Sequence, residues 1–322
     1  MLAQQFLYVP YNGYTYAITT GGYVMAFQQR NLVANFSVCT ACSLQSVAYD
    51  GANHRLYAAT VNGSAGNYSS YLVAISAATN SLIRGGTISL PRGDMAFAIT
   101  FAPVTNDLYA IVVPPGSSTQ MVVVSPEAGR VVGNITGCCS WTGYSDDPNL
   151  LYNQLNHYIY TPYDQVIDPV TARVVANIFP NTCIVGCGQI DLSPQSGVVY
   201  YWTGDSSGTG VYWQTAAVYG IDPITNQNSS YYYIQNSSVV SGLAYDFNDS
   251  TVYSSIFGAG HGYSTDLIAI NALTGTVTSL DSALPSGILS YSPSSHALYL
   301  SGWDKANTSS EAVYYIPLSS GE

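Results

Sequence analysis

The chain has 322 residues, of which 47% are apolar and only 8% charged, and seven basic against 18 acidic side chains give a formal net charge of −11. So few Lys and Arg residues exclude a basic surface for nucleic acid. No apolar run reaches the roughly 18 residues that a membrane helix needs, and the first ten residues lack the basic start and apolar core of a signal peptide. We therefore expect a mature chain or an excised piece without a membrane span.

One unit recurs along the chain in order. It has a short apolar strand, a turn of Asp, Pro, Asn, Ser or Gly, and a second strand built around a Tyr, at residues 6–19, 46–61, 98–113, 144–161, 190–203, 243–256 and 289–302. Most units continue with a third strand, a tight turn and a fourth strand, as in "MVVVSPEAGRVVGNI". The pattern lacks helical periodicity and predicts an all-β fold, a β-propeller with seven blades of four antiparallel strands.

The repeats set the expected organisation of the chain. We expect a single domain over residues 1–322, with blades at about 6–38, 46–90, 96–136, 144–179, 188–235, 241–281 and 287–318. A β-helix has shorter rungs, and a pair of sandwiches would not repeat seven times. The last repeat supplies three strands, and "MLAQQ" is too short to add a fourth and also reach the channel. We therefore expect a three-stranded or weakly closed last blade, whose edge could accept a strand from another chain.

One stretch resembles a known family. "QVIDPVTARVVANI" at residues 165–178, preceded by "NHYIYT", is similar to the repeat of YVTN-type β-propellers, which are abundant in archaeal surface-layer and other cell-surface proteins. The second strands carry Tyr-Ala, Tyr-Tyr or Tyr-Ser where the family has Tyr-Val-Thr-Asn. The resemblance implies a seven-bladed propeller at the cell surface, but a propeller fold does not by itself define a function.

The chain direction sorts candidate residues onto two faces of the predicted ring. The first-to-second and third-to-fourth turns share one end, the turn face, and the other connections share the loop face. His54, His157 and His296 occupy the same first-to-second turn position and are interpreted as solvated turn residues. Polar and aromatic side chains expected near the loop-face channel mouth, where propellers bind ligands, are His261, Asp94, Asp205, Asp304, Trp141, Trp202 and Trp303.

Sequons and cysteines favour an extracellular protein. The sequon asparagines are Asn35, Asn62, Asn67, Asn134, Asn228, Asn236, Asn248 and Asn307, and the six cysteines are Cys39, Cys42, Cys138, Cys139, Cys183 and Cys187. The cysteine pairs lie in links between blades. Local disulfides are natural for Cys39–Cys42 and Cys183–Cys187, whereas a bond between adjacent cysteines is strained because neighbouring Cα atoms are only about 3.8 Å apart. For Cys138 and Cys139 three alternatives stay open: that strained bond, pairing with Cys183 and Cys187, or a metal.

The predicted function is that of a non-catalytic propeller. We expect a secreted or cell-surface protein that binds other proteins or glycans, or assembles within an envelope layer, with no catalytic residue, metal or cofactor assigned. The alternative is a propeller enzyme of the lactonase or lyase kind with its site at the loop-face channel mouth, where His and Asp side chains would transfer protons. A self-assembling architectural subunit is a third hypothesis.

Overall fold

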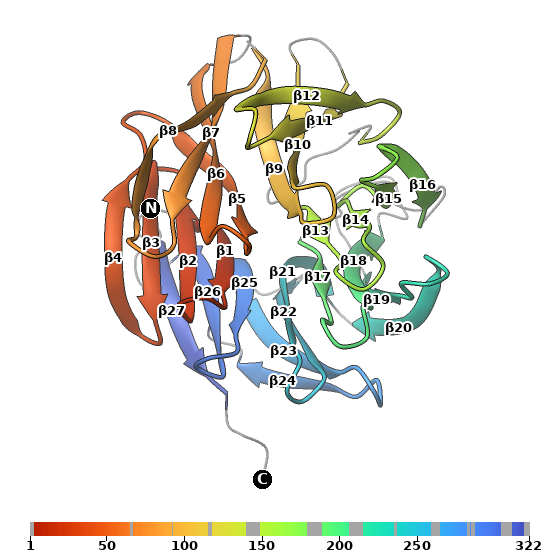
Figure 1. Ribbon diagram of the computed structural model, residues 1–322. Coiled ribbons are helices and arrows are strands. Elements are labelled where there is room, and N and C mark those ends of the chain that lie inside the picture. Colours follow the sequence, from red (N-terminus) through yellow and green to blue (C-terminus); the bar gives the residue numbers. More distant parts are fainter. Residues whose placement is uncertain are drawn as a thin grey trace.

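The structure is a computed structural model in which seven antiparallel sheets stand around a central channel (Figure 1). It describes the chain except residues 1–2, 65–66, 92, 115–117, 140–148, 179–188, 206–214, 235–236, 259–264, 282–283, 285–286, 304–310 and 319–322. The described residues contain no helix of the length and apolarity that crossing a membrane requires. Each sheet is one blade, and the blades follow one another in chain order. The predicted seven-bladed all-β fold is therefore confirmed.

Within each blade the strands run antiparallel from the channel to the rim. The bounds are as follows: blade 1, β1 Ala3–Val9, β2 Tyr14–Thr19, β3 Tyr23–Gln28 and β4 Asn31–Ser37; blade 2, β5 Ser43–Asp50, β6 Arg55–Ser64, β7 Asn67–Ser76 and β8 Ser81–Ser89; blade 3, β9 Met95–Ala102, β10 Asp107–Val113, β11 Gln120–Ser125 and β12 Arg130–Ile135; blade 4, β13 Leu151–Tyr152, β14 Ile159–Tyr160, β15 Gln165–Asp168 and β16 Arg173–Asn177; blade 5, β17 Asp191–Leu192, β18 Val199–Asp205, β19 Thr215–Ile221 and β20 Asn228–Ile234; blade 6, β21 Ser237–Asp246, β22 Thr251–Gly258, β23 Thr265–Asn271 and β24 Val277–Asp281; blade 7, β25 Gly287–Ser292, β26 Ala297–Trp303 and β27 Glu311–Pro317.

Blade 7 has three strands within the described chain, as the sequence predicts, and β27 pairs there with β26 alone. The N-terminal segment forms the innermost strand of blade 1 instead of an outer strand of blade 7. At the closure, the backbone N–H of Ala3 donates to Ser301 Oγ at 3.1 Å. Among the described residues the ring therefore closes by side-chain contacts between blades 7 and 1 and not by a shared sheet.

The first-to-second turns explain part of the repeated sequence. In every blade one residue of the first-to-second turn has a positive φ. It follows, by five positions, an aromatic residue or leucine near the end of the innermost strand. These residues are Gly13, His54, Asn106, His157, Gly197, Ser250 and His296. Gly adopts this conformation without strain, and Asn and His are enriched there among other residues. The three turn histidines are therefore compatible with a purely conformational role.

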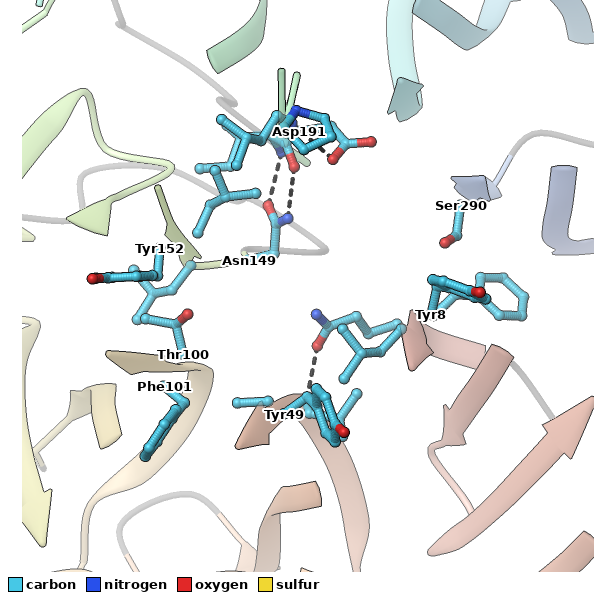
Figure 2. A pocket seen from close by; sticks show the side chains of 18 of the residues that line it. Tyr8, Tyr49, Thr100, Phe101, Asn149, Tyr152, Asp191 and Ser290 are labelled. Atoms are coloured by element: carbon cyan, nitrogen blue, oxygen red, sulfur yellow. Dashed lines mark hydrogen bonds between the residues drawn. The ribbon is translucent and has the colours of Figure 1, made fainter. Parts of the chain in front are cut away.

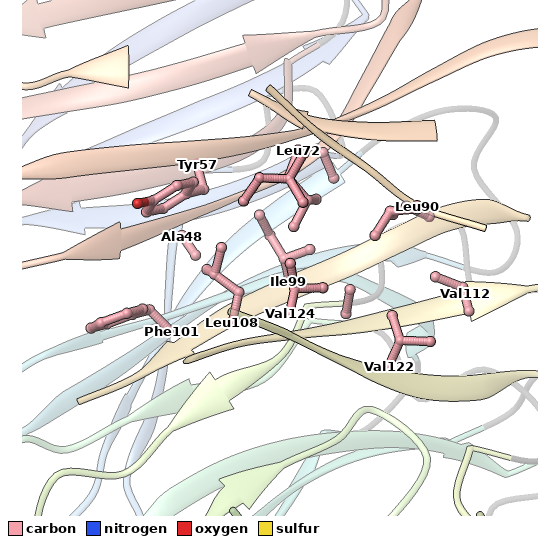
Figure 3. Packing of buried hydrophobic residues seen from close by; sticks show 14 of the residues in the cluster. Ala48, Tyr57, Leu72, Leu90, Ile99, Phe101, Leu108, Val112, Val122 and Val124 are labelled. Atoms are coloured by element: carbon pink, nitrogen blue, oxygen red, sulfur yellow. The ribbon is translucent and has the colours of Figure 1, made fainter. Parts of the chain in front are cut away.

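The core lies between blades, with one buried apolar cluster at each of the seven junctions. The cluster between blades 2 and 3, where Leu72 and Ile99 meet, has fifteen buried members (Figure 3). The cluster between blades 7 and 1 has five among the described residues. Because burial of apolar area is the main stabilising contribution, the closing junction has the smallest share of it among the described residues.

A second contact joins neighbouring blades at the turn face, and we call it the blade latch. At the junctions of blades 1 and 2, 3 and 4, 4 and 5, and 7 and 1, the second-strand Tyr of one blade donates its phenol proton to the third-to-fourth turn of the next blade. Tyr160 donates to Asn226 Oδ1 at 2.7 Å, and Tyr109 donates to the carbonyl of Pro169 at 3.0 Å. Tyr16 bonds in the same way to Asn80, and Tyr299 to the carbonyl of Gln29. The repeated Tyr therefore fills the core and also satisfies its hydroxyl on the adjacent blade.

Candidate functional site

The central channel contains a cavity of about 500 Å³ that is lined by the innermost strands of all seven blades. Its lining runs from Gln5 to Pro10 in blade 1, and equivalent segments from the other blades reach the starts of their first-to-second turns. The cavity therefore lies on the turn-face side of the channel, whereas the sequence predicted a loop-face site. A concave site of this volume is typical of small-ligand pockets.

One lining residue per blade forms a collar where the inner strand enters its turn. The collar residues are Tyr8, Tyr49, Phe101, Tyr152, Leu192, Tyr245 and Tyr291. Tyr8, Tyr49 and Tyr152 are only half-buried and lie around the open centre of the channel (Figure 2), whereas Phe101, Tyr245 and Tyr291 are buried. Flat aromatic rings with a polar end suit ligands that combine an apolar face with hydroxyl groups.

Below the collar, three amide side chains join the inner strands of different blades. Gln5 Oε1 accepts the backbone N–H of Val47 at 2.8 Å. Asn149 accepts the N–H of Ile190 at 2.8 Å and donates to its carbonyl at 2.7 Å. Gln189 accepts the N–H of Leu243 in blade 6 at 3.1 Å. It also donates to the carbonyl of Leu289 in blade 7 at 2.6 Å. These amides satisfy backbone groups on the strand edges that face the channel.

Asp191 is the single carboxyl group among the described residues that line the cavity, and Lys, Arg and His are absent from that lining. Its Oδ2 accepts the N–H of Tyr245 at 2.7 Å and its Oδ1 that of Leu192 at 2.8 Å. Burial nevertheless raises the pKa of Asp191 to about 6, because desolvation outweighs these hydrogen bonds. Above that pH the cavity carries one negative charge and disfavours anionic ligands.

Five of the seven loop-face candidates cannot be assigned a side-chain environment. His261, Asp304 and Trp141 lie outside the described residues. Asp205 ends β18 and Trp303 ends β26, where the backbone is described but not the side chain. Their predicted role in binding therefore stays a prediction.

The other two candidates, Asp94 and Trp202, lie in the interior. Trp202 is 8% exposed and packs in the cluster between blades 5 and 6, so it presents no ring to a ligand. Asp94 is 4% exposed, and burial raises the pKa of its carboxyl group. Neither lines the cavity. The sequence placed both in loop-face segments, but strand β18 and the link before β9 turn these side chains toward the core.

The cysteines differ from one pair to the next. Cys39 and Cys42 form a disulfide with their Cα atoms 5.9 Å apart, as the sequence predicts. Cys138 and Cys139 are buried free thiols, so the strained bond between them, one of the three alternatives, is not formed. Cys139 instead donates its N–H to Gln165 Oε1 at 2.5 Å, and Cys138 Sγ contacts the carbonyl of Ile135. The hydrogen bond between the two thiols lowers the pKa of Cys138 and raises the pKa of Cys139. Cys183 and Cys187 lie outside the described residues.

The sequon asparagines that the structure describes are all exposed: Asn35, Asn62, Asn67, Asn134, Asn228 and Asn248. Three of them, Asn35, Asn134 and Asn228, lie on outermost strands at the rim. Asn236 and Asn307 lie outside the described residues. Exposure is a requirement of glycosylation, so these six positions remain candidates for it.

The turn-face histidines have more specific surroundings than the sequence indicated. Each ring Nδ1 lies within hydrogen-bonding distance of the collar Tyr five residues earlier: 3.3 Å for Tyr49 and His54, 2.8 Å for Tyr152 and His157, and 3.1 Å for Tyr291 and His296. The repeat alignment contained this spacing, because Tyr and His recur together in blades 2, 4 and 7. The collar tyrosines therefore hold the three histidines in place beside the turn-face opening of the cavity.

Comparisons with known proteins support the fold alone. No protein-family model and no curated protein matches the chain. A solved structure of hydrazine synthase from Kuenenia stuttgartiensis is similar over 98% of this chain and 96% of that one. Its TM-score is 0.63 and its identity 14%. The WD40 β-propeller domain of Doa1 is similar over 95% of this chain and 90% of that domain, with a TM-score of 0.60 and 11% identity. These proteins differ in function, so the similarity is one of architecture.

Proposed function

We propose that the chain is a secreted or cell-surface propeller of YVTN type, glycosylated at its rim. It binds a neutral glycan without chemical conversion, in the turn-face mouth of the central channel. The observation that carries the proposal is the cavity of about 500 Å³, with half-buried tyrosines at its collar and no cationic side chain in its described lining. Sugar rings present an apolar face that packs on aromatic rings and hydroxyls that bond to phenols and amides.

The composition of the lining narrows the ligand class. Asp191 is the single charged group in the described lining, and above its pKa of about 6 it repels carboxylate, sulfate and phosphate groups. A neutral oligosaccharide has no such conflict. The exposed sequons and the Cys39–Cys42 disulfide support an extracellular location, where glycans are common partners.

The test is an array of neutral and acidic oligosaccharides, followed by calorimetry with the best neutral binder at pH 7.5. We expect Tyr8→Ala and Tyr152→Ala each to weaken binding about tenfold, since an aromatic contact contributes about 1 kcal/mol beyond the buried area. The control is Tyr23→Ala, which removes a 38% exposed tyrosine from β3, outside the cavity. An array that retains only acidic glycans, or equal losses for Tyr23→Ala and Tyr8→Ala, contradicts the proposal.

A second candidate function is envelope assembly, and the outer edge of blade 7 favours it. Strand β27 pairs with β26 on one side only within the described chain, and an unpaired edge can accept a strand from a second copy. Light scattering over a wide range of protein concentrations tests this candidate. We expect mass to increase with concentration, whereas a monomeric mass at the highest concentration would refute assembly through this edge.

A further inference from the structure

Two first-to-second turns meet on the turn face where blade 6 joins blade 7. Asp246 ends β21, Asp249 lies in the turn between β21 and β22, and His296 lies in the turn between β25 and β26. One ligand atom from each of the three side chains lies within 4.8 Å of the other two. His296 Nδ1 is 3.5 Å from Asp246 Oδ2. Two carboxyl groups of blade 6 and one imidazole of blade 7 are thus brought together outside the cavity of the central channel.

Asp246 is fully buried, and its two oxygens have different surroundings. Oδ1 accepts the N–H of Asn248 at 2.8 Å, which fixes the turn. Oδ2 is buried on the side of His296 and accepts no hydrogen bond from the described residues. A buried carboxylate oxygen without a donor is unfavourable unless a cation or a proton compensates it.

Asp50 shows that the turn itself does not require this arrangement. It occupies the equivalent position in blade 2, yet both of its oxygens are satisfied. Oδ1 accepts the N–H groups of Ala52 and Asn53, and Oδ2 accepts the side-chain amide of Asn53. At this turn position the carboxyl oxygen is therefore satisfied in blade 2 but not in blade 6.

We propose that Asp246, Asp249 and His296 bind a divalent first-row transition-metal ion, with Zn²⁺ as the reference ion. Imidazole nitrogen and carboxylate oxygen are standard ligands of zinc and its neighbours, whereas Ca²⁺ and Mg²⁺ take oxygen ligands almost exclusively. Three protein ligands leave one position of a tetrahedral ion for water. Asp249 is exposed and His296 is half-buried, so the ion enters from the turn face.

Neighbouring polar groups hold the imidazole beside the carboxylates. Tyr291 places its hydroxyl 3.1 Å from His296 Nδ1, and Asn248 donates its amide to that hydroxyl at 2.5 Å. The bound ion would connect blade 6 to blade 7, which lacks within the described chain the third-to-fourth turn that a blade latch needs.

The test is zinc calorimetry at pH 7.5 on the full chain without an affinity tag, after treatment with a chelator. We expect one high-affinity ion per chain and a higher melting temperature with zinc. His296→Asn and Asp249→Asn should each weaken binding about 10- to 100-fold. Asn suits the positive φ of 44° at His296, and Asp249 is exposed, so both variants should fold.

The matched control is His54→Asn. His54 has the same place in its blade and a φ of 51°, but it stacks on Tyr11 and does not belong to the carboxylate cluster. The His54→Asn variant should bind zinc as tightly as the wild type does. The proposal is overturned if the wild type binds no zinc, if His54→Asn loses as much affinity as His296→Asn, or if Ca²⁺ binds as tightly as Zn²⁺. A thiolate-to-metal band in the Co²⁺-loaded protein, which would place the ion on cysteine, also overturns it.

Discussion

Two junctions of the ring place equivalent turn histidines in different surroundings. They are the junction of blades 1 and 2 and the junction of blades 6 and 7. At the first, His54 stacks on Tyr11 with ring centroids 3.8 Å apart. At the second, His296 faces Asp246 and Asp249. The histidines share a backbone conformation and a Tyr partner, so the difference comes from the preceding blade. The surroundings of a turn histidine thus depend on the preceding blade and not on the sequence of its own repeat.

The inner strands of the two junctions also differ. Three residues before the collar Tyr, blade 1 has Gln5, whose side chain reaches the N–H of Val47 at 2.8 Å. Blade 6 has Gly242 at that place, and an added Cβ would lie 2.3 Å from the carbonyl oxygen of Gly287 in blade 7. At the first junction a side chain of the inner strand itself reaches the next blade, whereas at the second the two inner-strand backbones are in contact and the bridging side chain, Gln189, comes from blade 5. The junction of blades 6 and 7 therefore tolerates less added side-chain volume than the junction of blades 1 and 2.

Gly242→Ala should have the largest effect on this comparison. The new Cβ would overlap backbone atoms of Gly287 and Leu289, which cannot move without shifting β25, and we expect the free energy of unfolding to fall by about 3 kcal/mol. Urea denaturation measures it. The control is Gly133→Ala in β12, where the added Cβ would meet Val123 Cβ at an ordinary 3.5 Å. Similar losses in both variants would contradict a close approach of blades 6 and 7.

The pH dependence of stability tests the buried carboxyl group of the second junction. Burial, and after it the neighbouring Asp249 carboxyl group, raises the pKa of Asp246 to about 6, against about 4 in the unfolded chain. The folded chain therefore binds the proton more tightly. The resulting stability is fully present below about pH 4 and is lost as the pH rises through 6. Tyr253, Tyr291, Asp249 and His296 are the titratable groups that face it.

In chelator, Asp246→Asn should reduce the decline in unfolding free energy between pH 4 and pH 6.5 by an amount on the order of 2 kcal/mol, at about 1.4 kcal/mol per pKa unit. Denaturation at a series of pH values measures the decline. Asp222→Asn is the control, because turn N–H groups lower the pKa of Asp222 and so confine its effect to lower pH. A profile for Asp246→Asn that parallels the wild type would show that Asp246 is not protonated in the folded chain.

The sequence predicted what is local to one repeat. The alternating strands, the turn residues and the recurring Tyr establish seven blades and the three-stranded last blade, because strand periodicity and turn chemistry act over a few residues. The cavity and the metal cluster combine repeats that are far apart in the chain. His296 was therefore assigned a solvated role, since nothing in its own repeat points to Asp246. Trp202 shows the same limit, because the adjacent blade 6 completes the cluster that buries it.

The smallest expected effect concerns the blade latch, which joins blades 4 and 5 and is absent from the described junction of blades 6 and 7. Tyr160→Phe deprives Asn226 Oδ1 of its 2.7 Å donor and Asn156 of its 2.8 Å acceptor, and we expect a loss of about 1 kcal/mol. Tyr253 has the equivalent place in blade 6, but the described part of blade 7 contains no third-to-fourth turn to receive its hydroxyl. Tyr253→Phe should therefore cost only a few tenths of a kcal/mol. Urea midpoints at an unchanged slope measure both variants, and equal losses would mean that the phenol contributes through the core and not through the latch.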